Sequence, residues 1–232
     1  MKTALRDRIG KARVSTVPSV AARARMALLA YLDTTSGDAV ADLADGTAAT
    51  DIAEAALSGA PTPPGLACAQ GCAFCCILSG ADGGTMTEAE ARRLHAALAP
   101  LAGQSDGRAW HPKACPALDP ETRMCRAYEA RPMICRTYVS TDADACAQVA
   151  EGTAVTGPGT LGPYHTYLAA LGLSRAALKG TRRVATYALS RLAAAAVSGD
   201  DIDTALNAAR HKPGELDAEL RRSKRDLGRM KT

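Results

Sequence analysis

Hydrophobic positions recur with a helical period along the first part of the chain. Apolar residues return every three to four positions through residues 20–32 and again through residues 40–57. This spacing places apolar side chains on one face of a helix. Gly37 and the glycine- and proline-rich residues 59–64 interrupt the pattern, because both residue types favour turns. Residues 1–64 are therefore predicted to form an N-terminal helical segment.

Turn-forming residues dominate the middle of the chain, where one regular helix is predicted. Thr87 and Glu90 have the spacing of a capping box, in which each side chain accepts a hydrogen bond from the other residue's backbone amide. Apolar residues follow on one face as far as residue 101. Beyond this helix, the pattern predicts short extended pieces around Cys115 and Cys125, joined by a turn, and a short helix or turn that carries Cys135.

Helical periodicity returns near residue 160. Helices are predicted over residues 160–173, 174–197 and 200–209 and from residue 213 to the end, with Ser174 and Asp200 as N-caps. Only 3% of the residues are aromatic, so the core must consist of small side chains on closely packed helices. The predicted fold class is mainly α, a helical body around an irregular cysteine-rich segment with little strand. We expect segments 1–64, 65–146 and 147–232 to pack into one compact domain.

Charge and hydropathy limit the partners and the cellular compartment that we expect for this protein. Residues 211–232 hold seven Lys or Arg against four Asp or Glu, without interleaved aromatic residues, so nucleic acid is not an expected partner. No apolar stretch approaches the ~20 residues of a membrane span. The basic N-terminus lacks the apolar run and cleavage site of a signal peptide. We therefore expect a cytoplasmic protein without membrane contact.

Eight cysteines are the main candidates for chemistry. Four fall within nine residues as C-x3-C-x2-C-C, and four follow singly. A chain of 232 residues can bury a core without cross-links, and a reducing compartment disfavours disulfides. Metal ligation is the favoured interpretation, with structural disulfides and ordinary core cysteines as alternatives. The candidate ligands are Cys68, Cys72, Cys75, Cys76, Cys115, Cys125, Cys135 and Cys146.

The spacing suits thiolate ligation but not a single simple site. Cys72 and Cys75 form a short loop that can direct two sulfurs at one ion, about 2.3 Å from each. Successive side chains point apart, so Cys75 and Cys76 are not expected to bind the same mononuclear ion. One tetrahedral zinc ion or one [4Fe-4S] cluster uses four thiolates. Either two sites share this region, or one cluster has spare thiols beside it; Cys146 is either a ligand or a plain helix cysteine.

The downstream cysteines lie in a longer pattern. Cys115-Pro116 is followed by Cys125-Arg126-Ala127-Tyr128-Glu129-Ala130-Arg131-Pro132-Met133-Ile134-Cys135-Arg136. Over residues 68–138 the chain resembles the YkgJ-type cysteine-cluster family, whose pattern is C-x2-3-C-x2-C-C, then C-P, then C-x-x-Y-x-x-R-P-x-x-C-R. The chain departs from that pattern at Ala117, where the family usually has a bulky apolar residue. This difference affects side-chain packing more than metal ligation.

The resemblance implies chelation of zinc or iron by the first seven cysteines. A related cluster in flagellin lysine methylases looks like an iron-sulfur site, which favours an iron-sulfur cluster over zinc as the cofactor. The expected partner is therefore a metal ion or cluster, and no protein partner is identified.

Other polar residues near the cysteines have competing interpretations. Arg126, Arg131 and Arg136 would offset the negative charge of a thiolate site, or Arg131 would pair with Glu129 or Asp119. His111 precedes Cys115 by four residues and is interpreted as a loop residue, not a ligand.

Three functions remain open at this point. The first is a metal-binding cysteine-cluster protein for electron transfer or metal handling. The second is a cluster-dependent, methylase-like enzyme acting on a protein side chain, and the third is a thiol-redox switch. Whether the protein is an enzyme stays open, because no catalytic motif stands outside the cysteines.

Overall fold

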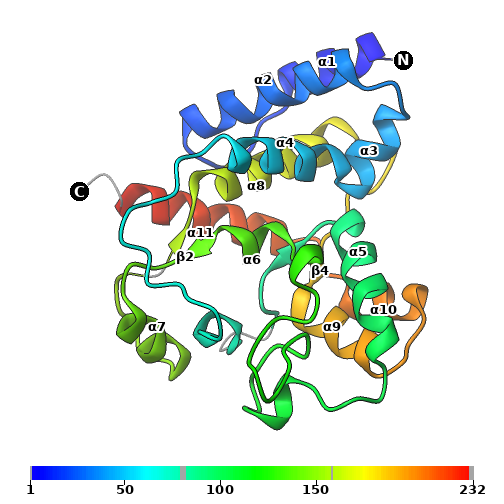
Figure 1. Ribbon diagram of the computed structural model, residues 1–232. Helices are drawn as coiled ribbons and strands as arrows, with labels where there is room; N and C mark the ends of the chain where they lie inside the picture. Colours follow the sequence, from blue (N-terminus) through cyan, green and yellow to red (C-terminus); the bar gives the residue numbers. More distant parts are fainter. Residues whose placement is uncertain (1, 79–81, 158, 230–232) are drawn as a thin grey trace.

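Helices make up most of the molecule, as the sequence predicts (Figure 1). A computed structural model describes residues 2–78, 82–157 and 159–229. The α-helices in these ranges are α1 (Lys2–Lys11), α2 (Pro18–Thr34), α3 (Ala39–Asp45), α4 (Thr47–Ser58), α5 (Glu88–Leu98), α6 (Met133–Thr137), α7 (Ala143–Ala150), α8 (Gly162–Ala177), α9 (Leu189–Val197), α10 (Ile202–Ala209) and α11 (Glu215–Arg229). The mainly α fold class is confirmed.

Strand content is small and serves to connect distant segments. Strand β1 (Thr85–Met86) pairs antiparallel with β4 (Tyr187–Ala188), and β2 (Tyr138–Val139) pairs antiparallel with β3 (Gly159–Thr160). Each pair joins the cysteine-bearing segment to the helices that follow it. Short 3-10 turns complete the middle of the chain: η1 (Phe74–Cys76), η2 (Ala99–Leu101), η3 (Gly107–Ala109) and η4 (Tyr128–Ala130).

The first hydrophobic core lies among the N-terminal helices, α8 and α11. Leu28, Leu43 and Leu171 are fully buried there, together with Ala170 and the ring of Tyr167. Burying a leucine side chain stabilises a fold by roughly 1.5–3 kcal/mol, and alanine allows the helices to approach closely. The expectation of a core built from small side chains on packed helices is confirmed.

The second hydrophobic core joins the cysteine-bearing segment to α5, α9 and α10. Leu98, Leu192 and Leu206 are buried beside Cys115 and Leu118. In Figure 1 these three helices lie together at the lower right, below the upper layer of α1, α2, α4 and α8. Residues 147–232 thus contribute to both cores.

Glycine 46 divides what the periodicity predicts as one helical stretch. Helix α3 ends and α4 begins at this residue, whose φ of +87° lies in the left-handed region. A side chain here would be strained, and its Cβ would lie only 2.3 Å from Cγ2 of Thr87. Gly46 therefore allows both a sharp turn and close contact with the start of α5.

Two predicted helix starts in the C-terminal segment are wrong. Ser174 is buried inside α8, which continues to Ala177, and the next helix begins only at Leu189. Asp201, not Asp200, caps α10 by accepting hydrogen bonds from the amides of Asp203 and Thr204. Helix α8 ends just before a turn at Gly180, whose φ of +80° lies in the left-handed region.

No helix within the described ranges combines the length and apolar character that crossing a membrane requires.

Candidate metal centre

The cysteines lie on loops and short helices of the middle segment. Cys68 and Cys72 lie on the loop before η1, and Cys75 and Cys76 lie within η1. Cys115 and Cys125 lie in irregular chain, Cys135 lies in α6, and Cys146 lies in α7. All eight thiols are free; Cys68 and Cys75 are exposed, Cys115 is buried and the other five are partly buried.

Backbone pairing brings the first cysteine run onto the segment around Cys115. The amide of Cys115 donates to the carbonyl of Cys76 at 2.7 Å, and the amide of Leu78 donates to the carbonyl of Lys113 at 2.8 Å. Ile77 and Ala114 form an antiparallel bridge between these hydrogen bonds. This pairing holds two cysteines that are 39 positions apart on adjacent backbones.

A second turn folds Cys125 back toward the same place. Leu118 and Cys125 form an antiparallel bridge. The carboxylate of Asp119 closes the intervening turn by accepting from the amides of Glu121 and Thr122 at 3.1 and 2.8 Å. The predicted turn over residues 119–122 and the extended pieces beside it are confirmed.

Glu90 fixes the helix that carries Cys135. Its carboxylate completes the predicted capping box with Thr87, and it also accepts from the amide of Met133 at 2.7 Å and from the hydroxyl of Tyr167. Glu90 is fully buried, and burial raises its pKa, although the donors around it act in the opposite direction. One buried carboxyl group thus connects α5, α6 and α8.

Glycine 71 shapes the loop between Cys68 and Cys72. Its φ is +78°, a conformation that glycine adopts without steric cost. A Cβ at this position would lie 3.6 Å from the carbonyl oxygen of Thr122. The loop therefore lies against the turn that precedes Cys125.

Five thiols form an inner set, defined as Cys75, Cys76, Cys115, Cys125 and Cys135. Burial raises the pKa of Cys115 to about 12 and that of Cys135 well above its ordinary value. Neighbouring thiols in the set add to each shift: Cys115 is affected by Cys125 and Cys75, and Cys76 by Cys115 and Cys135. These thiols therefore lie within electrostatic range of one another.

The remaining three thiols form an outer set, defined as Cys68, Cys72 and Cys146. Burial raises the pKa of Cys146, and Cys72, Cys68 and Cys75 raise it further. The Cys68 thiol donates to the carbonyl of Ser140 at 3.8 Å, shortly before α7 begins. Cys75 lies within electrostatic range of both sets and therefore connects them.

The thiols of Cys75 and Cys76 lie close enough to shift each other's pKa. A hydrogen bond from the Cys76 thiol lowers the pKa of Cys75 to about 7, and the Arg131 guanidinium adds to this effect. The same hydrogen bond, together with burial, raises the pKa of Cys76 far above its ordinary value. The 3-10 geometry of η1 allows this contact.

The thiols lie near one another, but they are not arranged around a common point at which one metal ion could bind. Among the described residues, no three His, Cys, Asp or Glu side chains are arranged to hold one metal ion. Thiolates nevertheless suit zinc and iron-sulfur clusters. The donor set fits such a centre, and binding would need the thiol side chains of neighbouring loops to move closer together.

The three arginines near the cysteines have different roles. Arg131 stacks over the ring of Tyr128, with 3.6 Å between the guanidinium carbon and the ring centroid, and its Nε donates to the carbonyl of Tyr128. Burial raises the pKa of Cys125 and of Cys135, and the Arg131 charge opposes this shift and so favours the thiolate forms. The stacking of Arg131 on Tyr128, three residues before it, is a contact that the sequence pattern did not predict.

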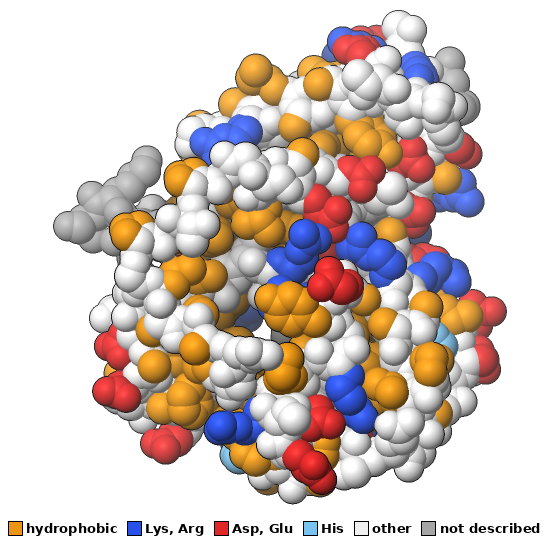
Figure 2. All heavy atoms as spheres, viewed as in Figure 1, with side chains coloured by type: hydrophobic (Ala, Val, Ile, Leu, Met, Phe, Trp, Pro, Cys, Tyr) orange, Lys and Arg blue, Asp and Glu red, His pale blue; other side chains and the backbone are white. Residues whose placement is uncertain are grey.

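Arg126 and Arg136 contact other partners. Arg126 donates to the carbonyl of Pro116 at 3.3 Å and so supports the C-P turn. Arg136 pairs with Glu54 of α4 at 2.6 Å, and Glu54 also pairs with Arg93. Figure 2 shows basic and acidic side chains interleaved across the middle of this face, between the upper helices and the cysteine-bearing part.

The imidazole of His111 takes part in its own loop. Its Nδ1 accepts from the amide of Lys113 at 3.1 Å. This agrees with its interpretation as a loop residue.

The cysteine-bearing segment matches a known protein family. Residues 67–153 match the model of the CxxCxxCC family, described as "Putative zinc- or iron-chelating domain". This segment is a CxxCxxCC domain. It contains all eight cysteines, including Cys146, which lies beyond the pattern that the sequence resemblance covers. No curated protein and no solved structure shows a significant match to the chain.

The CxxCxxCC domain supports metal binding as the property of this segment. Its matched span covers η1, α5, α6 and α7, which are the elements that position the thiols. The helices α1–α4 and α8–α11 lie outside it; they supply most of the first hydrophobic core and about half of the second.

Proposed function

We propose that the CxxCxxCC domain holds a thiolate-ligated metal centre, with an iron-sulfur cluster preferred over zinc. The observation that carries the proposal is the gathering of eight free thiols from five separate stretches of chain into two adjoining sets. Eight thiolates exceed the four that one tetrahedral zinc ion or one [4Fe-4S] cluster uses. A reducing compartment such as the cytoplasm would keep these thiols available.

The grouping favours two centres of four thiolates each. Cys76, Cys115, Cys125 and Cys135 would supply one centre, and Cys68, Cys72, Cys75 and Cys146 would supply the other. Cys75 lies within electrostatic range of both sets. We assign it to the outer centre because it is exposed, as Cys68 is, and because this gives four thiolates to each centre. Its neighbour Cys76 lies within range of Cys115 and Cys135.

Exposure favours electron transfer or metal handling over a purely structural role. Cys68 and Cys75 are exposed, so the centre that they would help to form lies at the surface. A centre with ligands at the surface can exchange an electron or an ion with a partner. When bound, an iron-sulfur cluster would supply one-electron redox chemistry.

Anaerobic purification followed by metal and acid-labile sulfide analysis tests the proposal. Iron with matching sulfide is the expected result. Stoichiometric zinc without sulfide would mean that the centre holds zinc and not an iron-sulfur cluster. A metal-free protein whose cysteines are found in disulfides would contradict both the iron-sulfur cluster and the zinc centre.

Single cysteine variants test the division into two centres. Cys72→Ser and Cys135→Ser should each remove about half of the metal, because each leaves the other centre intact. Ala69→Ser is the matched control, since it adds the same side chain to the exposed loop between Cys68 and Cys72. Unchanged metal content in both cysteine variants would refute ligation, and complete loss in either would refute two independent centres.

A thiol-redox switch is the second candidate, and the Cys75–Cys76 contact favours it. A thiol with a pKa of about 7 is substantially ionised near neutral pH, and the thiolate is the form that attacks disulfides. Under this alternative the metal-free chain would form a disulfide reversibly. Mass spectrometry of alkylated protein, before and after mild oxidation, would detect it.

A further inference from the structure

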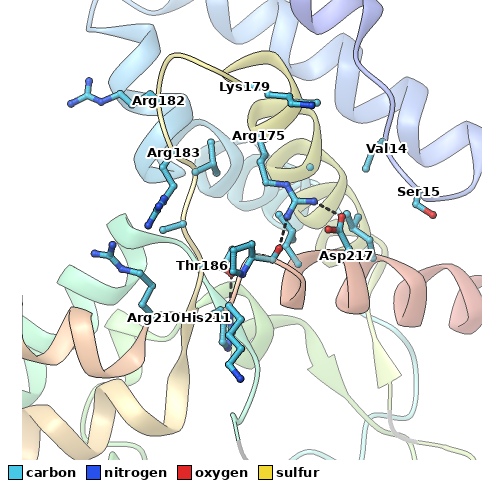
Figure 3. A pocket seen from close by; sticks show the side chains of 18 of the residues that line it. Val14, Ser15, Arg175, Lys179, Arg182, Arg183, Thr186, Arg210, His211 and Asp217 are labelled. Carbon is cyan, nitrogen blue, oxygen red and sulfur yellow. Dashed lines mark hydrogen bonds and ion pairs between the residues drawn. The ribbon is translucent and has the colours of Figure 1, made fainter.

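A second site lies outside the CxxCxxCC domain. A pocket of about 490 Å³ opens between the end of α8, residues 178–186, residues 210–213, the start of α11 and the link between α1 and α2 (Figure 3). Its volume falls within the roughly 300–1,000 Å³ that is typical of small-molecule sites. None of its described lining residues falls within residues 67–153.

The lining of this pocket is strongly basic. Asp217 is the one acidic residue among the described residues that line it. The Lys and Arg residues that line it are Arg13, Arg175, Lys179, Arg182, Arg183, Arg210 and Lys212. They come from three separate parts of the chain, at residues 13, 175–183 and 210–212, so a local run of basic sequence does not account for all of them.

The single acid is already engaged. Asp217 forms an ion pair with Arg175, which also donates to the carbonyl of Pro213 at 3.0 Å. These contacts, drawn in Figure 3, fasten α8 to the start of α11. The carboxylate therefore neutralises one cation of the seven.

Most of the remaining cations have no anionic partner among the residues that the structure describes. Within the described parts of the chain, the side chains of Arg13, Lys179, Arg182, Arg183 and Lys212 form no ion pair or hydrogen bond. Arg210 lies over the ring of Tyr187, 5.9 Å from its centroid. The C-terminal end of α8 accounts for nearby cations such as Lys179, but not for Arg210 or Lys212, which follow α10.

The base of the pocket is apolar and closely packed. Val14, Leu216 and Leu220 line it, and a Cβ added at Gly172 would lie 2.6 Å from Cγ2 of Val14. On its wall, the Thr186 hydroxyl and Nδ1 of His211 form a hydrogen bond of 3.1 Å. In Figure 3, Arg183 and Arg210 extend toward the same side of the opening.

These features fit one class of ligand. Guanidinium groups bind phosphate through paired hydrogen bonds, and an apolar base suits an organic group attached to it. A concave pocket suits a small molecule better than a nucleic acid strand, and the described lining contains no Phe, Tyr or Trp for base stacking. We propose that this basic pocket binds a small organic anion that carries phosphate, of about nucleotide size, independently of the metal centre.

Calorimetric titration of the full chain tests the proposal. ATP, pyrophosphate and adenosine are the probes, without added divalent cations, at low and at moderate salt. We expect ATP and pyrophosphate to bind and adenosine not to bind, with affinity falling as salt rises because the contacts are charged. Absence of binding by ATP and pyrophosphate at millimolar concentration would overturn the proposal.

Paired variants locate the binding. The double variant Arg183→Ala/Arg210→Ala should weaken ATP binding at least tenfold. Arg23→Ala/Arg225→Ala is the matched control, because it removes the same charge from exposed positions outside the pocket and should leave binding unchanged. If both double variants weaken ATP binding equally, the effect is due to the overall charge of the protein and the proposed site is refuted.

Two further titrations separate this proposal from its alternatives. The variant Cys72→Ser should bind ATP as the unaltered chain does. ATP binding therefore does not depend on whether the metal centre forms. A single-stranded oligonucleotide should bind more weakly than ATP. If the oligonucleotide binds more tightly than ATP, and the variant Arg183→Ala/Arg210→Ala abolishes that binding, the ligand of the pocket is nucleic acid and not a small molecule.

Discussion

At the scale of single residues, charge around the thiols is the decisive feature. Arg131 is held by its stack on Tyr128, and its charge favours the thiolate forms of Cys75, Cys125 and Cys135. A metal-thiolate centre with four or more thiolates carries net negative charge, which a fixed guanidinium would offset. The sequence pattern contains Arg131 and the cysteines but says nothing about the stacking, which depends on the η4 turn.

Replacing Arg131 should therefore weaken metal binding. Arg131→Gln removes the charge, at a cost on the order of 1 kcal/mol to the bound centre, or about fivefold in affinity. Arg131→Lys is the control, since it keeps the charge while losing the planar stack. Competition with a chelator measures the difference, and equal affinities of the Gln variant and the unaltered chain would exclude an electrostatic role.

At the scale of elements, Glu90 couples the formation of one helix to the position of another. The capping box at the start of α5 was predicted from Thr87 and Glu90 and is confirmed. The same carboxylate reaches the first residue of α6 and the Tyr167 hydroxyl in α8. Gly46 makes room for this arrangement, because its missing side chain allows α4 to approach Thr87.

Glu90→Gln should destabilise the fold and loosen the Cys135 helix. The amide nitrogen would replace an acceptor, leaving the buried amide of Thr87 or Met133 unsatisfied at a cost of about 1–3 kcal/mol. Urea unfolding measures this loss, and metal content reports on α6. The control is Glu121→Gln, which makes the same change at an exposed position. A free energy of unfolding equal to that of the control would contradict this role.

At the scale of the whole molecule, the two hydrophobic cores are joined by helices and short strand pairs. Cys115 is buried within the second core, and Cys76, Cys125 and Cys135 pack against it. The first core is built mainly from the helices outside the CxxCxxCC domain. A metal bound by the cysteines would therefore stabilise one core more directly than the other. The boundaries near residues 64 and 146, within one compact domain, stay a prediction.

Metal removal should produce a corresponding pattern of hydrogen exchange. Treatment with a chelator should lower amide protection in α5, α9 and α10 more than in α2, α4 and α8, because binding free energy is folding free energy for the part that holds the metal. Cys135→Ser, treated in the same way, should show a smaller further change. A uniform loss of protection over both groups of helices would contradict the expectation.

The sequence by itself determined the local features: the mainly α class, the capping box, the turn over residues 119–122 and the cysteine pattern of a chelating domain. Such features depend on contacts within a few residues, which the order of side chains specifies directly. Only the tertiary structure decided that Cys76 lies beside Cys115, that Glu90 reaches α6, and that Arg13, Arg183 and Arg210 line one pocket. These groupings join residues far apart in the chain, and the packing of helices around two cores brings them together.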